Sequence, residues 1–464
     1  VVGSSAYIIA RDPFRSIRRG RQLFQRKFTN LQGQGPNERD GVGDIALDKG
    51  IGAGLSDSCA SCHGRPRGSG GAGGDVVTRP DSRDAPHLFG LGLKEMLADE
   101  ITADLRAIRA TAVALAQRRH RPVTLKLVGK GIQYGSLTAA ASGSLDTSGV
   151  RGVDPDLRVR PFFAEGSTIS IREFVVGALH NEMGLEASDD PDLTVARAGG
   201  RVVTPSGMVL DGSQDRIEGP PEPDAHNGSE IDPALVDHLE FYLLNYFKPA
   251  LYKQTDATDQ GRALFKRIGC ASCHVPDLTI NHDRRVADVE TAYDPARGVF
   301  NSLFATAAPL FKNVDDGSGN PPLRVAAGSS FLVRNIFTDF KRHDLGPNFY
   351  ERNWDGTTQK TFLTRPLWGV GSTGPYGHDG RSITLREVIL RHGGEAEAEG
   401  DAFAALSERQ ADHLLQFLNA LVLFPPDDTA SNLDPGDPTR AGFPQTGHGS
   451  IKLSVLFNDP ADPE

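Results

Sequence analysis

The pentapeptide CASCH occurs twice in this sequence, at Cys59–His63 and at Cys270–His274, and the chain has no other cysteine. Two thiols separated by two residues can add across the two vinyl groups of haem, and the histidine that follows can bind the iron axially. A zinc site divided between the motifs would not need a histidine in both copies, and a redox dithiol would not need doubling. The spacing therefore predicts two covalent haem c groups. Their attachment and proximal residues would be Cys59, Cys62 and His63, and Cys270, Cys273 and His274.

Covalent haem attachment implies a location outside the bacterial cytoplasm, so we expect a periplasmic or secreted protein. The sequence begins at Val1 without the basic start and apolar run of a signal peptide, which we expect to have been removed. No apolar stretch approaches the ~18 residues that cross a bilayer, so we expect no membrane span.

The composition indicates a chain with many loops, since apolar residues make up 38% and the 464 residues include 52 glycines and 30 prolines. Two large apolar macrocycles could complete cores that such a chain cannot fill with side chains alone. The formal net charge of −10 argues against nucleic acid or an anionic membrane as a partner.

Two pairs of similar segments divide the chain into related halves. GRQLFQRKF from Gly20 precedes the first motif and GRALFKRIG from Gly261 precedes the second, while VDHLEFYL from Val236 matches ADHLLQFL from Ala411. All four have the apolar periodicity of amphipathic helices. Each half therefore contains a helix, a haem motif, long loops and a closing helix, which is the order of the cytochrome c fold, where the first and last helices cross beside the haem.

From this order we predict a mainly α fold with two cytochrome c-like domains, at residues 1–250 and 251–427. A proline- and aspartate-rich tail over 428–464 would wrap the surface. His238 and His413 occupy equal places in the repeat, and we interpret them as histidines on helix surfaces.

The sixth ligand of each iron decides between an electron carrier and an enzyme. The second half contains no methionine, since the chain has only Met96, Met183 and Met208. A histidine is therefore the expected sixth ligand of the second haem. The candidates after the second motif are His282, His343, His378, His392, His413 and His448.

The stretch TRPLWGVGSTGPYGHDGRSITLREVILRHGGEA, from Thr364, resembles the bacterial diheme cytochrome c peroxidases and their relatives, the methylamine-utilisation diheme enzyme and the diheme rubber oxygenases. It is most similar to the peroxidase-like diheme oxidoreductase family. RDAPHLFGLGL, ISIREFVVGALHNEMGL and FAALSERQADHLLQFLNAL also match that family, so the resemblance covers both halves.

In these relatives the sixth ligand of the electron-transfer haem follows the PYxHDG histidine by fourteen residues. That histidine is His378 here, which is itself a candidate catalytic residue, and fourteen residues later stands His392. The resemblance implies His274/His392 ligation, where the peroxidases have Met and the methylamine enzyme has Tyr. Bis-histidine ligation should give a lower reduction potential than His/Met ligation. Alternatively, His392 only caps its helix ahead of Gly393.

The resemblance also implies a calcium ion between the haems, held by Asp84, Thr373 and Pro375. Aspartate replaces the asparagine of the peroxidases and keeps an oxygen ligand suited to a hard cation. Asp84 could instead pair with Arg83.

The first haem departs from the peroxidases, because the glycine-rich stretch at 68–82 contains no histidine to close the iron. We expect an open or water-bound sixth position, which His87 could close. Glu95 or Glu100 could move a proton during peroxide cleavage, although either could equally lie on a solvated helix face. Phe89 or Trp368 could occupy the gap between the haems.

We therefore expect a diheme oxidoreductase that reduces hydrogen peroxide at the first haem. A small redox protein or another donor would supply electrons through the second haem. One alternative is an oxygenase that uses dioxygen on an apolar substrate, with a pocket built by the insertion at 104–157. The other is an electron carrier with both irons six-coordinate.

Overall fold

The computed structural model describes residues 1–35, 56–64, 75–76, 83–187, 190–218, 230–247, 250–251, 254–293, 303–353 and 356–423. The predicted tail at 428–464 and most of the glycine-rich stretch at 68–82 lie outside these ranges. No helix in the described part of the chain combines the length and apolar character that crossing a membrane requires.

Among the described residues 39% are helical and 19% lie in strands, so the fold is mixed and the prediction of a mainly α protein is only partly confirmed. The helices are α1 (Ser5–Arg11), α2 (Pro13–Gln25), α3 (Cys59–Cys62), α4 (Leu91–Arg119), α5 (Ile171–Met183), α6 (Pro191–Arg197), α7 (Pro233–Asn245), α8 (Asp256–Arg267), α9 (Leu385–Leu390), α10 (Glu397–Ala404) and α11 (Glu408–Asn419). Short 3-10 turns are η1 (Asn30–Gln32), η2 (Cys270–Ser272), η4 (Pro347–Phe349) and η5 (Gly394–Ala396).

The described strands pair antiparallel, mostly as two-stranded ribbons. One three-stranded sheet contains β3 (Val123–Gly129), β4 (Ile132–Ala139) and β5 (Leu145–Asp146). The pairs are β1 (Asp75–Val76) with β2 (Arg83–Asp84), β6 (Arg201–Val203) with β7 (Val209–Asp211), β8 (Ala250–Leu251) with β19 (Leu421–Val422), β9 (Leu278–Ile280) with β14 (Phe331–Val333), β10 (Ala287–Tyr293) with β11 (Leu303–Pro309), β12 (Phe311–Val314) with β13 (Leu323–Ala326), β15 (Arg342–Asp344) with β18 (Thr361–Leu363), and β16 (Glu351–Arg352) with β17 (Thr358–Gln359).

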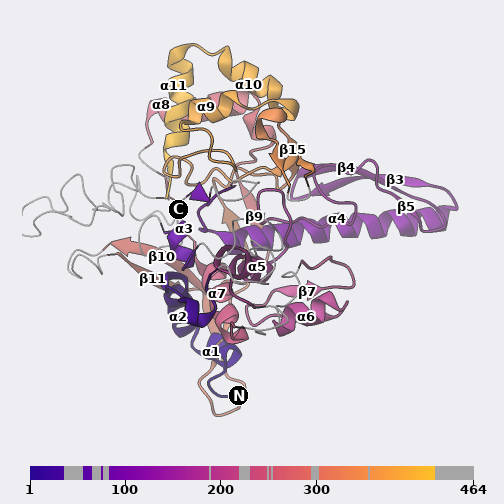
Figure 1. The fold of residues 1–464 in the computed structure, drawn as a ribbon. Coiled ribbons are helices and arrows are strands. Elements are labelled where there is room, and N and C mark those ends of the chain that lie inside the picture. Colours follow the sequence, from indigo (N-terminus) through magenta and orange to yellow (C-terminus); the bar gives the residue numbers. More distant parts are fainter. Residues whose placement is uncertain are drawn as a thin grey trace, which may run out of the picture.

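Each half contains one closely crossed helix pair, α2 with α7 and α8 with α11, as the repeat predicted. Glycine sets the approach at both crossings. A Cβ atom at Gly20 would lie 2.1 Å from the carbonyl oxygen of His238, and one at Gly261 would lie 2.0 Å from that of His413. Because glycine has no side chain, the two helix backbones can touch. The close crossing therefore explains why each repeated segment begins with glycine. Figure 1 shows the two pairs in opposite parts of the molecule.

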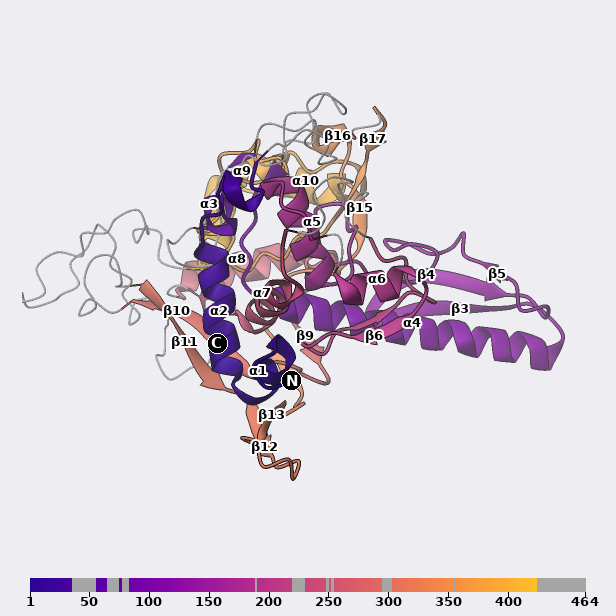
Figure 2. The same ribbon diagram turned by 60° about the horizontal axis from the view of Figure 1, so that its bottom comes forward.

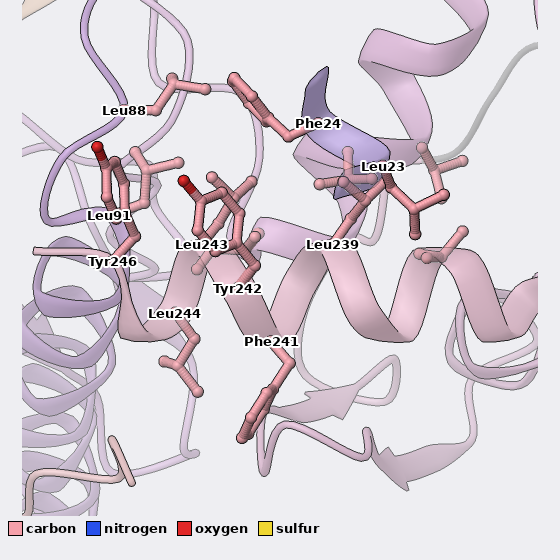
Figure 3. Close-up of a cluster of buried hydrophobic side chains, with 14 of the residues drawn as sticks. Leu23, Phe24, Leu88, Leu91, Leu239, Phe241, Tyr242, Leu243, Leu244 and Tyr246 are labelled. Carbon is pink, nitrogen blue, oxygen red and sulfur yellow. The ribbon is translucent and has the colours of Figure 1, made fainter. Parts of the chain in front are cut away.

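The core of the first half surrounds α7. Tyr242 and Leu243 lie on the side of α7 that faces Phe24 and Leu88, while Phe241 and Leu244 point to the opposite side (Figure 3). His238 lies inside this core at 3% exposure, with Nδ1 2.8 Å from Oγ of Ser16. The interpretation of His238 as a surface histidine was therefore wrong, because α7 is buried around most of its circumference. His413 is half-buried.

The insertion at 104–157 forms an arm. The second half of α4 and the sheet β3–β4–β5 extend together away from the rest of the molecule in both views (Figures 1 and 2). Alternate residues of β3 and β4 are buried, and they pack with Ala112 and Ala116 of α4. The same hydrophobic cluster continues into the second half through Ile280 and Val333. The arm thus buries its own apolar faces.

Strands of the second half complete the first half. The side-chain oxygen of Asn245, the last residue of α7, accepts hydrogen bonds from the backbone nitrogens of Val286 (2.9 Å) and Ala287 (3.0 Å). Both residues also belong to the core of the first half. The packed cores therefore cross the boundary predicted near residue 250.

Candidate functional site

A cavity of about 650 Å³ lies where the two halves meet, and both CASCH motifs line it. Phe162, Phe163 and Phe174 contribute to its wall in the first half, and Phe349, Phe362 and Phe403 in the second. None of the residues that line it comes from the arm. The expectation that residues 104–157 build an apolar pocket at the first haem therefore does not hold.

His63 follows α3 directly, so the helix carries both cysteines of the motif and the turn at its end presents the imidazole. Nδ1 of His63 lies 2.7 Å from the carbonyl oxygen of Pro86. A carbonyl only accepts, so Nδ1 holds the proton and Nε2 keeps its lone pair for a metal. Removal from water lowers the pKa of His63 to about 4, which keeps the ring neutral at pH 7.

His274 repeats this arrangement in the second half. Its Nδ1 donates to the carbonyl of Phe337 (3.0 Å), and burial lowers its pKa to about 4. Nδ1 of His392 donates to the carbonyl of Val388 at 2.7 Å, and burial lowers the pKa of this ring too. His392 also contributes to the lowered pKa of His274, so the two rings are neighbours on one cavity. All three imidazoles thus have the same tautomer, with Nε2 unbonded.

These residues fit covalent haem. The four cysteines are free thiols, and burial raises the pKa of Cys59 and of Cys270 to about 12, so neither sulfur is an isolated buried anion. The cavity supplies apolar walls, paired thiols and neutral imidazoles, which are the groups that a c-type haem requires. The haem-binding roles of these residues and the iron ligation by His392 remain predictions that this geometry supports.

His87 also lines the cavity, and its Nε2 donates to the carbonyl of Trp368 at 3.0 Å. Its Nδ1 is buried and has no hydrogen-bond partner among the described residues. Phe89 and Trp368 both line the cavity, and a Cβ atom at Gly90 would lie 2.7 Å from the indole of Trp368. Both aromatic candidates for the gap between the haems therefore lie where the two halves touch.

The three predicted calcium ligands lie on this cavity as well. A Cβ atom at Gly380 would lie 3.2 Å from Cβ of Asp84 and 3.4 Å from Cγ of Pro375, so these two residues are neighbours although they belong to different halves. Arg83 does not pair with Asp84. It binds Glu165 (2.7 Å) and Glu351 instead.

Residues 283–421 match the sequence model of the family described as "Di-haem oxidoreductase, putative peroxidase". The matched segment lies in the second half of the chain, and this part of the sequence is similar to that family. The match confirms the family resemblance and the assignment as an oxidoreductase enzyme, and the family implies two haems. No curated protein matches the chain.

Two solved structures show weak likeness to this chain. Hydrazine synthase of Kuenenia stuttgartiensis, pressurised with xenon, has 15% identity and a TM-score of 0.30, covering 67% of this chain and 88% of that one. A MauG-like protein associated with microbial copper homeostasis has 15% identity and a TM-score of 0.26, covering 71% and 87%.

Neither predicted catalytic glutamate lines the cavity. Glu95 is fully buried, accepts a hydrogen bond from the backbone nitrogen of Ile171 (2.6 Å) and pairs with Arg284. Burial raises its pKa to about 8. Glu100 binds Lys130 and the backbone nitrogens of the loop at 281–282. Both carboxylates hold α4 to neighbouring segments, so neither is placed to act on a ligand of the first haem.

His378 does line the cavity. Its ring stacks on Phe362, with centroids 3.9 Å apart, and its Nε2 lies 3.2 Å from the carboxylate of Glu351. Burial lowers its pKa, and Glu351 opposes that shift. Its backbone oxygen accepts from the nitrogen of Asp84 (2.9 Å), so His378 also joins the halves.

Sequence reasoning missed Glu182. One face of α5 turns Val175, Ala178, Leu179 and Glu182 toward the cavity at i, i+3, i+4 and i+7. The backbone oxygen of Glu182 accepts from the nitrogen of Ser56 (3.0 Å), just before the first motif. A single carboxylate on an otherwise apolar helix face was the signal that could have identified it.

Proposed function

We propose that this chain reduces hydrogen peroxide to water at the haem attached to Cys59 and Cys62. The reaction consumes one peroxide, two protons and two electrons and yields two waters. A small redox protein of the same compartment is the proposed donor, with electrons entering at the haem of the second half. The haem attachment motif supports a periplasmic or secreted location.

One observation carries the proposal, which is the different surroundings of the two motifs on one cavity. His274 has a second neutral imidazole, His392, as its neighbour. His63 has His87 as its neighbour, but Nε2 of His87 already donates to the carbonyl of Trp368 (3.0 Å). The helix face beside the first motif also offers the carboxylate of Glu182. Two imidazoles suit an iron that only transfers electrons. A carboxylate beside the other iron suits a reaction that moves protons.

The haems, when bound, would supply one-electron redox chemistry at the two motifs. His63 would hold the iron of this haem through Nε2, and its Nδ1 contact with the carbonyl of Pro86 fixes the ring orientation. Glu182 takes a proton from one peroxide oxygen and returns it to the other as the O–O bond breaks. The phenylalanines of the wall limit the entry of bulk water.

The resting absorption spectrum tests the proposal first. A high-spin component is expected from the first haem, and a fully low-spin spectrum would support the electron-carrier alternative instead. Anaerobic reduction followed by titration with peroxide should then oxidise both haems, with two electrons consumed per peroxide.

Glu182→Gln should slow the reaction with peroxide by about 10²-fold or more, because a positioned general acid–base group contributes that much. The matched control is Glu408→Gln, since Glu408 is an exposed carboxylate on α11. Equal rates for the two variants would exclude Glu182 as the proton carrier.

A further inference from the structure

Two cationic side chains face the cavity without a counter-ion. Lys94, one turn into α4, and Arg365, which precedes the PLWG segment, both line it. Within the described residues neither makes a hydrogen bond or an ion pair with a carboxylate. The nearest aromatic contact of Lys94 is with Phe162, whose ring centroid lies 5.4 Å from Nζ.

The segments that carry these cations touch. His87 donates to the backbone oxygen of Trp368, and the indole of Trp368 lies over Gly90, where a Cβ atom would come within 2.7 Å. Lys94 follows Gly90 by four residues, and Arg365 precedes Trp368 by three. The two cations therefore belong to different halves and line the cavity near the place where these halves touch.

Both cations are removed from water at this joint. Burial and, as a smaller cause, the charge of Arg365 lower the pKa of Lys94 to about 7. Burial also lowers the pKa of Arg365, although Asp84, Glu165 and Glu351 oppose this. Glu165 and Glu351 are already bound to Arg83. Two like charges removed from water are costly unless an anion accompanies them.

A haem carries such anions. One edge of the macrocycle bears two carboxylates, while the vinyl groups that react with the cysteines lie on the rest of its rim. Burial, Lys94, Arg365 and His63 all lower the pKa of His87, which places both cations in electrostatic range of the first motif. We propose that Lys94 and Arg365 bind the carboxylates of the haem attached to Cys59 and Cys62, and so set its orientation and reduction potential.

The inference rests on the two-haem assignment and is independent of peroxide as substrate, since a reduction potential is measured without substrate. A buried positive charge stabilises the added electron, so each cation should raise the potential of the first haem. The two cations belong to different halves, so the bound carboxylates would also tie the halves together.

Spectroelectrochemistry of the holoprotein tests this. Lys94→Met and Arg365→Met should each lower the midpoint potential of the first haem, whereas Lys94→Arg and Arg365→Lys should stay near the native value. The control is Lys126→Met, because Lys126 is exposed on the arm and away from the cavity. If Lys94→Met does not accumulate, Lys94→Gln removes the charge while retaining polarity. Neutral variants with the potentials of the control would overturn the inference.

Titration with acetate separates a haem carboxylate from a diffusible anion. If the haem already occupies the cations, acetate should leave the native spectrum and potentials unchanged. A saturable acetate response that Lys94→Met abolishes would instead assign the cations to an external carboxylate and overturn the proposal. The midpoint potentials and the acetate titration are measured without peroxide turnover. The proposal for Lys94 and Arg365 can therefore be tested even if the peroxidase proposal fails.

Discussion

The imidazole of His392 donates its Nδ1 proton to the carbonyl of Val388, on the last turns of α9. If Nε2 binds the second iron, His392→Met should keep that iron low-spin and raise its reduction potential, because thioether replaces imidazole. His392→Ala should open the position and add a second high-spin signal. Absorption spectra and potentiometry report both. An unchanged low-spin spectrum in His392→Ala would mean that another residue is the ligand.

His343 lies between two carboxylates on the wall of the second half. Its ring nitrogens lie 2.9 Å from Asp339 and 2.8 Å from Glu395. Burial opposes charging of the ring, but the hydrogen bonds to Asp339, Cys273 and Glu395 raise its pKa to about 10. The folded-state pKa is above the unfolded value of about 6.5. The charged His343 ring therefore contributes its full stabilisation of the folded protein below pH 6.5, and this contribution is lost as the pH rises through about 10.

We expect the thermal midpoint of the native protein to fall between pH 7 and 10 more steeply than that of His343→Gln. His282→Gln, at an exposed position, serves as the control. Parallel pH profiles for the native protein and His343→Gln would show that the charged ring contributes nothing to stability.

At the residue scale, the sequence predicted the haem motifs because their chemistry depends on neighbouring residues. It did not predict which side of α4 or α5 faces the cavity. A helix turns about 100° per residue, so Lys94 lines the cavity while the adjacent Glu95 points into the protein. Which of two adjacent helix residues faces the cavity depends on the segments that pack against the helix.

At the element scale, the crossings of α2 with α7 and of α8 with α11 depend on one glycine each. Gly20→Ala and Gly261→Ala should each cost about 1–3 kcal/mol, because the added methyl group must push a carbonyl of the partner helix away. Chemical denaturation of the holoprotein measures this. Gly177→Ala on α5 is the control, since a Cβ atom there meets nothing within 4 Å.

For Gly177→Ala we expect unchanged or slightly increased stability, because alanine favours helix more than glycine does. If all three alanine variants lose the same stability, the close crossings are not what the repeated glycines provide.

The repeated helices could be predicted because both copies keep the same apolar spacing. The arm could not. Its helix and strands alternate apolar and charged residues as a haem pocket wall could, and only the structure shows that Ala112 and Ala116 pack against its own sheet. The strand pairs of the second half that cover the first half also lack any local signal, because their partners lie far away in the sequence.

At the scale of the whole molecule, Asp84 and Pro375 bring the two halves to one point. We propose calcium there, supported by their placement around Gly380. Removing the ion with a chelator should lower the thermal midpoint of the holoprotein and shift its absorption spectrum, and added calcium should restore both. Asp84→Ala should remove the response. Metal analysis that finds no calcium in the native holoprotein would contradict the proposal.

Replacing both Cys270 and Cys273 with Ala should reduce the covalent haem content from two to one per chain, measured as pyridine haemochrome. The first haem should remain attached, because its own thiols are intact. The variant with one haem should be less stable than the native holoprotein, since both motifs share one cavity. Retention of two covalent haems would contradict the assignment of the second motif.

The shared cavity has a consequence for biosynthesis. A newly made chain that has not received its haems has no group to fill the cavity. The phenylalanines of both halves that line this cavity are then exposed to water. Neither half can finish folding alone, because each supplies part of the other's wall. Haem attachment is then the closing step of folding as well as the supply of iron. Chains that receive neither haem should be the most open to proteases, and chains with one haem should be less stable than chains with two.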